Sequence, residues 1–278
     1  MHIRPGRQLI RSGIGRTGVG LLAVVVLVAA IGPLISPDPA RETVRVLEPP
    51  SAGHPLGSDD VGHDVWARLA SGARTSMVVA MGAGLLSTFL SAAVGISAGL
   101  AGGLYERASM RLVDALLVMP SILVLILLSA FIQPGIAGLI LLISVMQWPG
   151  GARVLRAQTL SLKERPHVHA SRAFGAGALH VVTRHIVPDL APLLVVSFIH
   201  RARRAVFMEA GLAFIGIAAP SMVSWGTMIR NALGFYYTPA WSWWLLPPGI
   251  CLSLLILSFL FIGHSLEKVM EPRLSPSR

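Results

Sequence analysis

Long apolar stretches are the feature that most constrains this chain. The run from Leu21 to Ile31 contains no polar side chain. A helix needs about 20 predominantly apolar residues to cross the hydrocarbon core of a bilayer, and comparable stretches recur along the sequence. They cover residues 17–35, 76–99, 112–132, 136–148, 190–217 and 243–262. We therefore expect an all-α fold, a polytopic membrane helix bundle with six transmembrane helices.

The composition excludes an ordinary water-soluble enzyme. The 278 residues are 54% hydrophobic and only 13% charged, with a mean hydropathy of +0.69, whereas soluble domains carry about 25% charged residues. The net charge is +10, which in a soluble chain would suggest a nucleic-acid partner. In an apolar chain the same charge indicates basic loops on the cytoplasmic side of a membrane, so we expect no nucleic-acid partner.

The basic residues also orient the helices. With the first 16 residues inside, fifteen of the 23 Lys and Arg residues fall in cytoplasmic segments and five in external ones, which is the bias that keeps basic loops inside. Both termini are therefore predicted to be cytoplasmic. The predicted segments are an N-terminal arm (1–16), a first transmembrane helix (17–35), an external segment (36–75) and a core domain (76–278) with five helices and a cytoplasmic loop at 149–189.

Prolines mark the limits of two predicted helices. The first is predicted to be a retained helix and not a cleaved signal peptide, because Pro33, Pro37 and Pro39 follow it where a small-residue cleavage site would be expected. The fourth is short, and the sequence Pro149-Gly150-Gly151 is expected to end it.

Motifs for catalysis and for metal binding are absent. The only two lysines, Lys163 and Lys268, do not follow a glycine, so the chain lacks the loop that cradles ATP phosphates. No serine-hydrolase or zinc-protease motif occurs, and the single cysteine, Cys251, can form neither an internal disulfide nor a cysteine cluster. We expect no enzymatic activity, no cofactor and no metal site. Four histidines of the cytoplasmic loop are interpreted as surface or packing residues: His167, His169, His180 and His185.

The cytoplasmic loop has the pattern of two short helices. Pro166 suits the first turn of a helix, and Gly175 with Gly177 suits a helix stop and a reversal. A second helix is expected from Ala178 to Ile186, ended by Pro188. Such a compact element at the membrane surface would fit a socket on a partner protein.

This loop resembles the EAA loop of ABC importer permeases. The family pattern begins with Glu-Ala-Ala and has a glycine four residues after the second alanine, followed later by a proline. Here these positions hold His169-Ala170-Ser171, Gly175 and Pro188. The leading glutamate of the family is His169 here. The resemblance implies that the loop couples the chain to an ATPase. The residues implied in coupling are His169, Ala170, Ser171, Arg172, Ala173, Phe174, Gly175, His185 and Pro188.

Further passages resemble one branch of that family, the dipeptide, oligopeptide and nickel importer permeases. The branch signatures are matched, in collinear order over nearly the whole chain, by residues 54–64, 72–76, 209–216, 224–228 and 266–273. The chain is most similar to the second, C-type permease of such systems. The resemblance implies the type I importer permease fold in the cytoplasmic (inner) membrane of a prokaryote.

The same resemblance implies the function and the partners. The chain would form half of a translocation pore for di- or oligopeptides, together with a sister permease, two ABC ATPase subunits and an external substrate-binding protein. A nickel or metal-chelate cargo is the alternative within this branch, although no cluster of Met, His or Cys in the spans favours a bare metal. An integral-membrane enzyme or a scaffold is a more remote alternative.

The fifth apolar stretch is unusual because it carries His200, Arg201, Arg203, Arg204 and Glu209. Charges inside a span are costly, so they generally face a cavity or form ion pairs. Two interpretations stay open. In the first, Arg201, Arg204 and Glu209 line a path for a cargo that bears carboxylates. In the second, the arginines pair with Glu209, with Asp114 or with the sister permease.

Aromatic side chains mark the predicted external segment before the last helix. Trp225 and Tyr236 are expected to anchor the chain at the outer membrane interface or to line a gate that meets the binding protein. Both roles remain open from the sequence.

Overall fold

The structure is a computed structural model that describes residues 12–36, 38–40, 45–217, 219 and 222–270. Within this part of the chain the fold is all-α, as predicted, and the one β-type contact is an isolated bridge between Ser58 and Asp64. The helices are α2 (Gly13–Ile35), α3 (Val65–Ala101), α4 (Gly103–Val118), α5 (Ser121–Ile132), α6 (Ile136–Lys163), α7 (Pro166–Ala173), α8 (Ala178–Val181), α9 (Val187–Ile215), α10 (Trp225–Leu233) and α11 (Leu246–Met270), with π-helical turns η1 (Val182–Ile186) and η2 (Trp241–Leu245).

The number of apolar helices agrees with a polytopic membrane protein. Five are long and apolar enough to cross a membrane, and the count rises to six if the bent pair α4–α5 is one span. Parts of some predicted features lie outside the described residues, namely most of the N-terminal arm, Pro37 and the end of the signature passage 266–273.

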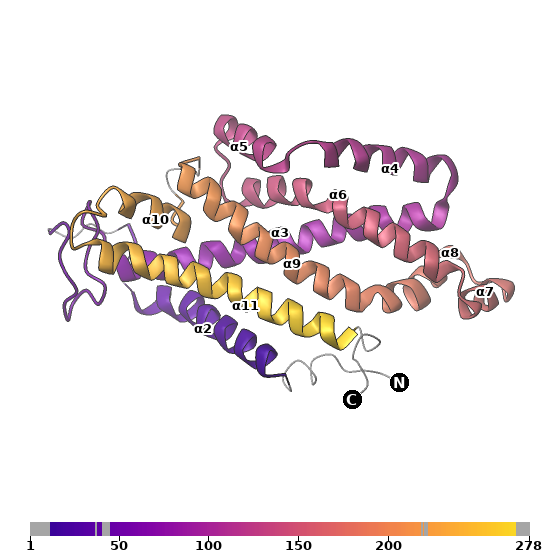
Figure 1. Cartoon of the computed structure of the whole chain (residues 1–278), viewed down its shortest axis with the longest axis horizontal. Helices are drawn as coiled ribbons and strands as arrows, with labels where there is room; N and C mark the ends of the chain where they lie inside the picture. Colours follow the sequence, from indigo (N-terminus) through magenta and orange to yellow (C-terminus); the bar gives the residue numbers. More distant parts are fainter. Residues whose placement is uncertain (1–11, 37, 41–44, 218, 220–221, 271–278) are drawn as a thin grey trace.

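Helix α3 is the centre of the bundle, with α6 and α9 packed along it (Figure 1). Its sequence is rich in small residues, which let helix backbones approach closely in a membrane. At Gly95, a Cβ atom would lie 2.5 Å from the carbonyl oxygen of Ala152 in α6. This close approach leaves no room for a side chain and fixes how α6 lies on α3.

Helix α2 packs against α11 and α3, although it stands first in the chain (Figure 1). The Ser12 hydroxyl, which caps α2 by accepting from the Gly15 N–H, lies 2.6 Å from the hydroxyl of Ser265 in α11. Val25 belongs to the same core cluster as Leu255 and Phe259 of α11. The first helix is thus part of the bundle.

The third predicted span is not one helix. It divides into α4 and α5, which are bent by 80° relative to each other. The break falls at Met119 and Pro120, where Met119 has extended backbone angles (φ −75°, ψ 128°). Proline disfavours a helical conformation in the residue before it and has no N–H to donate, so Pro120 accounts for the break.

The predicted end of the fourth helix is wrong. Helix α6 continues through Pro149-Gly150-Gly151 to Lys163. The Ser91 hydroxyl of α3 donates to the carbonyl oxygen of Trp148 (2.8 Å), and Pro149 is buried. Packing along α3 therefore holds this part of α6 helical despite its low helix propensity.

Pro188 does not end the second short helix of the cytoplasmic loop, which corrects another prediction. Helix α8 passes through η1 directly into α9, and residues from Ala178 to Ile215 form one continuous span. The proline stands at the start of α9. The π-helical turn before it already alters the hydrogen-bond register, and the first turn of a helix tolerates a missing N–H.

The connecting segments lie at opposite ends of the bundle. The short helices α7 and α8 lie at one end, on the right of Figure 1, whereas α10 and the described part of the segment that precedes α3 lie at the other end. The loop predicted to be cytoplasmic and the segments predicted to be external therefore lie at opposite ends.

Candidate translocation cavity and coupling loop

The turn between α7 and α8 is built around Gly175. Its φ of +85° is the left-handed conformation that favours glycine. The N–H of Ala176 donates to the carbonyl of Ser171 (3.1 Å), and the N–H of Gly175 donates to the carbonyl of Arg172 (2.9 Å). These two bonds form a Schellman motif, so Gly175 ends the first short helix, as its place in the sequence predicts. Gly177 instead has a φ of −68°.

The helix pair is anchored on one side and exposed on the other. Val168 and Ile186 are fully buried in a cluster with Leu155 of α6. In contrast, Phe174 is 92% exposed and Leu179 is 77% exposed. An apolar surface on a pair of helices fixed to α6 and α9 has the form of a docking element.

The polar residues of this loop form surface contacts. His169, at the position of the family glutamate, lies 3.2 Å from the carboxylate of Glu164, and both are exposed. The rings of His167 and His185 lie 5.6 Å apart, and Asp189 pairs with Arg165 at 3.4 Å. No three His, Cys, Asp or Glu residues in the described ranges are placed to hold a metal ion.

A cavity of about 670 Å³ lies beside the arginines of α9, a volume in the range of small-molecule sites. Its α9 lining follows helical spacing, since one face carries Ser197, Arg201 and Arg204. The complete lining is Gln147, Gly150, Gly151 and Val154 of α6, Ser197, His200, Arg201, Arg203, Arg204 and Phe207 of α9, and Ile256 of α11.

Arg201 is fixed in the wall of this cavity. It is only 9% exposed, and its Nη1 donates to the hydroxyl of Thr88 in α3 at 3.2 Å. A side chain at Gly151 would overlap its guanidinium and would also come within 2.6 Å of the Ser91 hydroxyl. Gly151, one of the two glycines that were expected to end this helix, thus makes room for a buried cation. The sequence does not reveal the roles of Thr88 and Gly151.

Glu209 does not pair with the arginines, which removes one of the three partners considered for them and leaves pairing with the sister permease open. It is fully buried, and its carboxylate accepts from the Ser76 hydroxyl at 3.3 Å, with Ser224 beside it. Asp114 pairs with Arg153 instead. Glu209 is also not among the lining residues of the cavity, so its place in a translocation path rests on the sequence alone.

Glu209 marks a junction where three of the matched signature passages meet. Gly72, from the passage 72–76, lies against Trp225, since a Cβ there would be 3.0 Å from Cδ1 of the indole. Gly226 similarly lies against Ala210 and Ala213 of α9. Passages far apart in the sequence are therefore brought together by close packing.

Trp225 is part of that junction and not of the surface. It is fully buried, and its indole N–H donates to the carbonyl of Leu69 at 2.9 Å. Interface anchoring and gate lining both need an accessible side chain, so the structure contradicts these roles for Trp225. Tyr236 is exposed and lies edge-on to Tyr237, and its proposed gate role remains a prediction.

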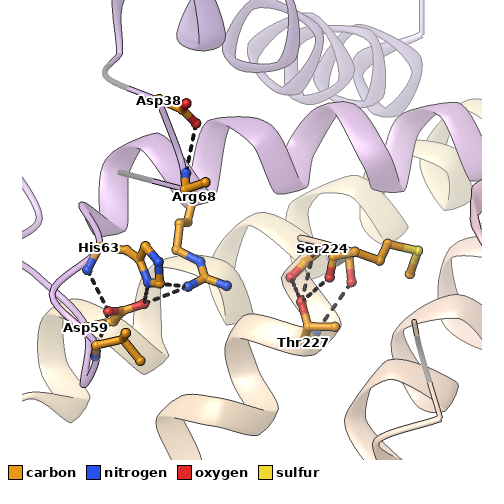
Figure 2. A network of polar contacts seen from close by, with 9 residues as sticks. Asp38, Asp59, His63, Arg68, Ser224 and Thr227 are labelled. Atoms are coloured by element: carbon orange, nitrogen blue, oxygen red, sulfur yellow. Dashed lines mark hydrogen bonds and ion pairs between the residues drawn. The ribbon is translucent and has the colours of Figure 1, made fainter. Parts of the chain in front are cut away.

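The signature passage 54–64 folds back on the start of α3. Figure 2 shows Asp59 accepting from the backbone N–H of His63 (2.8 Å) and from Nη1 of Arg68 (2.9 Å). Asp64 caps α3 by accepting from the Ala67 N–H. Partial burial raises the pKa of the neighbouring Asp60, and the negative charge of Asp59 raises it further. Asp59 and Asp64 thus have structural roles.

Figure 2 also shows how α10 begins. The Ser224 hydroxyl accepts from the Thr227 N–H (3.3 Å), and the Thr227 hydroxyl in turn accepts from the Ser224 N–H (2.9 Å). This reciprocal arrangement is a capping box. It explains why a serine precedes the tryptophan in the matched passage 224–228.

A bundle of membrane helices, an exposed helix pair at one end and a cavity between spans are features expected of a transport permease. Residues 91–276 match the family of binding-protein-dependent transport system inner membrane components, and the chain belongs to that family. It is therefore a permease subunit of an ABC transport system in the inner membrane, and it is not an enzyme. The ATPase is a separate subunit, and such a system includes a substrate-binding protein.

Curated relatives extend this similarity over almost the whole chain. A Brucella suis protein provisionally named a peptide transport system permease is 37% identical over 273 residues, which cover 96% of this chain and 90% of the relative. The dipeptide transport system permease protein DppC of Bacillus subtilis is 32% identical over 272 residues, covering 96% and 84%. A Brucella ovis peptide permease, also provisionally named, is 36% identical over 225 residues, covering 81% and 74%.

Proposed function

We propose that this chain imports di- or oligopeptides as one of two permease subunits around a shared path, driven by two ATPase subunits and supplied by an external binding protein. The observation that carries the cargo assignment is the collinear similarity, over 96% of the chain, to permeases named for peptides. The relatives named above give no support to the nickel alternative, so we do not propose it.

The coupling loop is proposed to receive the ATPase through Phe174, Leu179 and the residues from His169 to Gly175. Two features of the fold support this role. The apolar tip is exposed, and its base is buried against α6 and α9. Because α8 and η1 continue into α9, a movement of the tip would be transmitted along the helix that lines the cavity. His185 and Pro188 stand where this connection enters α9.

This connection supports an alternating-access mechanism. Closure of the ATPases would draw the coupling loops of the two permeases together, and the packed bundles would rock between inward-open and outward-open states. The rigid attachment of α7 and α8 through Val168 and Ile186 makes such a rigid-body movement the expected response.

Peptide uptake in cells tests the cargo assignment. Cells that lack this gene should lose uptake of a labelled tripeptide and regain it when the full chain is returned, while nickel uptake stays unchanged. If the cells instead lost nickel uptake but not peptide uptake, and regained nickel uptake with the full chain, the proposal would be rejected in favour of the metal alternative.

Cysteine labelling tests the proposed orientation. In a Cys251→Ala background, Tyr236→Cys should react with a membrane-impermeant maleimide in intact cells, because Tyr236 is exposed at the end proposed to be external. Phe174→Cys should react only after permeabilisation. The opposite pattern would invert the topology.

A further inference from the structure

We propose that the cavity lined by Arg201, Arg203 and Arg204 is a binding site for a carboxylate of the cargo. This inference rests on the proposed function, because it assigns a chemical class to the group that the permease itself holds during transport. The proposed site is the cavity between α6, α9 and α11, which belongs to the permease and not to the external binding protein.

The first support is uncompensated charge. Within the part of the chain that the structure describes, no carboxylate pairs with any of the three arginines, and the cavity lining contains no Asp or Glu. His200 does have a partner, the carboxylate of Glu267 at 2.7 Å. Cations at membrane depth are costly and normally meet an anion or a water-filled cavity. Three guanidinium groups beside one cavity therefore favour an anionic ligand.

The second support is that the site is built. Arg201 is held by Thr88 and occupies space left free by Gly151. A guanidinium presents a planar set of donors that matches a carboxylate in a two-point contact. Arg204 is exposed, so its guanidinium is accessible to a ligand in the cavity.

The third support is an unsatisfied acceptor beside these donors. Gln147 lines the cavity and is 7% exposed, and its Oε1 has no hydrogen-bond partner. The Nε atom of Arg203 is also buried without a partner. A buried polar atom without a partner needs an explanation, and beside a cavity a ligand or water can supply the missing interaction. A carboxylate suits the arginines, and a peptide N–H suits the glutamine oxygen.

Matched peptides in the reconstituted transporter test the proposal. The complete complex is placed in proteoliposomes with its own binding protein and supplied with saturating Ala-Glu-Ala, Ala-Gln-Ala or amidated Ala-Gln-Ala. Using one binding protein throughout cancels its preference when variants are compared. The ratio of Ala-Glu-Ala uptake to Ala-Gln-Ala uptake reports on a side-chain carboxylate. The ratio of Ala-Gln-Ala uptake to amidated Ala-Gln-Ala uptake reports on the terminal carboxylate.

We expect Arg204→Gln to lower at least one of these two uptake ratios about tenfold, the loss typical of removing one charge-assisted hydrogen bond. The ratio that falls identifies which carboxylate is bound. Arg204→Lys should keep only part of the preference, because it keeps the charge but loses the two-point contact. Arg107→Gln serves as the control, since it removes an exposed arginine of α4 that does not line the cavity.

Unchanged ratios in both Arg204→Gln and Arg201→Gln would overturn the proposal. If Arg201→Gln fails to assemble with the sister permease while Arg204→Gln leaves both ratios unchanged, the arginines serve subunit pairing and the carboxylate site is rejected. If the wild-type complex transports none of the three peptides, the proposed peptide function itself fails. The two failures are therefore distinguishable.

Discussion

At the scale of single residues, the fit between Gly151 and Arg201 is the most specific feature of the cavity. The glycine belongs to α6 and the arginine to α9, and the guanidinium occupies the space that a side chain at the glycine would need. A larger residue would displace the cation from its contact with Thr88. The pair thus positions the Arg201 guanidinium in the cavity wall.

Gly151→Ala should destabilise the protein by about 1–3 kcal/mol through overpacking. Gly150→Ala is the matched control, since its Cβ would come no closer than 3.9 Å to Leu117 and alanine is the better helix former. Thermal unfolding in detergent measures both variants, and we expect a lower midpoint only for the first. Equal midpoints for the two variants would show that the position of Arg201 does not depend on the space that Gly151 leaves free.

Trp225 gives a second prediction at this scale. Trp225→Phe removes the indole N–H that donates to the Leu69 carbonyl and should cost about 1 kcal/mol. Trp241→Phe alters an exposed tryptophan and should have a smaller effect on the thermal midpoint. A midpoint for the Trp225 variant at or above that of the Trp241 variant would contradict the buried role.

At the scale of elements, three prolines show how far the sequence predicts the helices. Pro120 breaks the third span, because proline disfavours a helical conformation in the residue before it. Pro149 and Pro188, which carry the same local signal, lie within or at the start of continuous helices. Contacts with α3 and a π-helical turn account for the difference, and neither is readable from local sequence.

The exposed tip of the α7–α8 pair gives the prediction that belongs to this scale. Changing both Phe174 and Leu179 to serine should weaken binding of the ATPase by at least about tenfold, because each side chain contributes about 1.5–3 kcal/mol when buried at an interface. Titration of the purified permease complex with ATPase measures the affinity. Val46→Ser, which alters an exposed apolar residue before α3, should leave it unchanged, and an equal loss in both would reject the tip as the docking surface.

At the scale of the whole molecule, the sequence predicts the class of the fold well and the cavity poorly. Apolar length and charge bias predict a helix bundle and its separated ends. The matched passages do not reveal that Gly72, Glu209 and Trp225 pack at one junction. Nor does the charge pattern show that the arginines of α9 face a cavity with no acid in its lining, since that depends on which helices pack beside them.

The proposed coupling loop would link this whole architecture to ATP hydrolysis. Gly175 and Gly177 are both exposed, and neither would bring a new Cβ within 4 Å of another group. They differ in backbone conformation, since only Gly175 has a positive φ. A valine at Gly175 would therefore strain the turn by about 1–2 kcal/mol, whereas a valine at Gly177 would not.

The most direct test measures ATP hydrolysis and peptide accumulation together in proteoliposomes that contain the complete transporter and its binding protein. The wild-type and Gly177→Val complexes should accumulate peptide in an ATP-dependent manner. Gly175→Val should continue to hydrolyse ATP while accumulation falls about fivefold or more, the shift expected from that strain. A wild-type complex that accumulates no peptide, or a Gly175→Val complex in which hydrolysis and uptake both remain normal, would contradict the account.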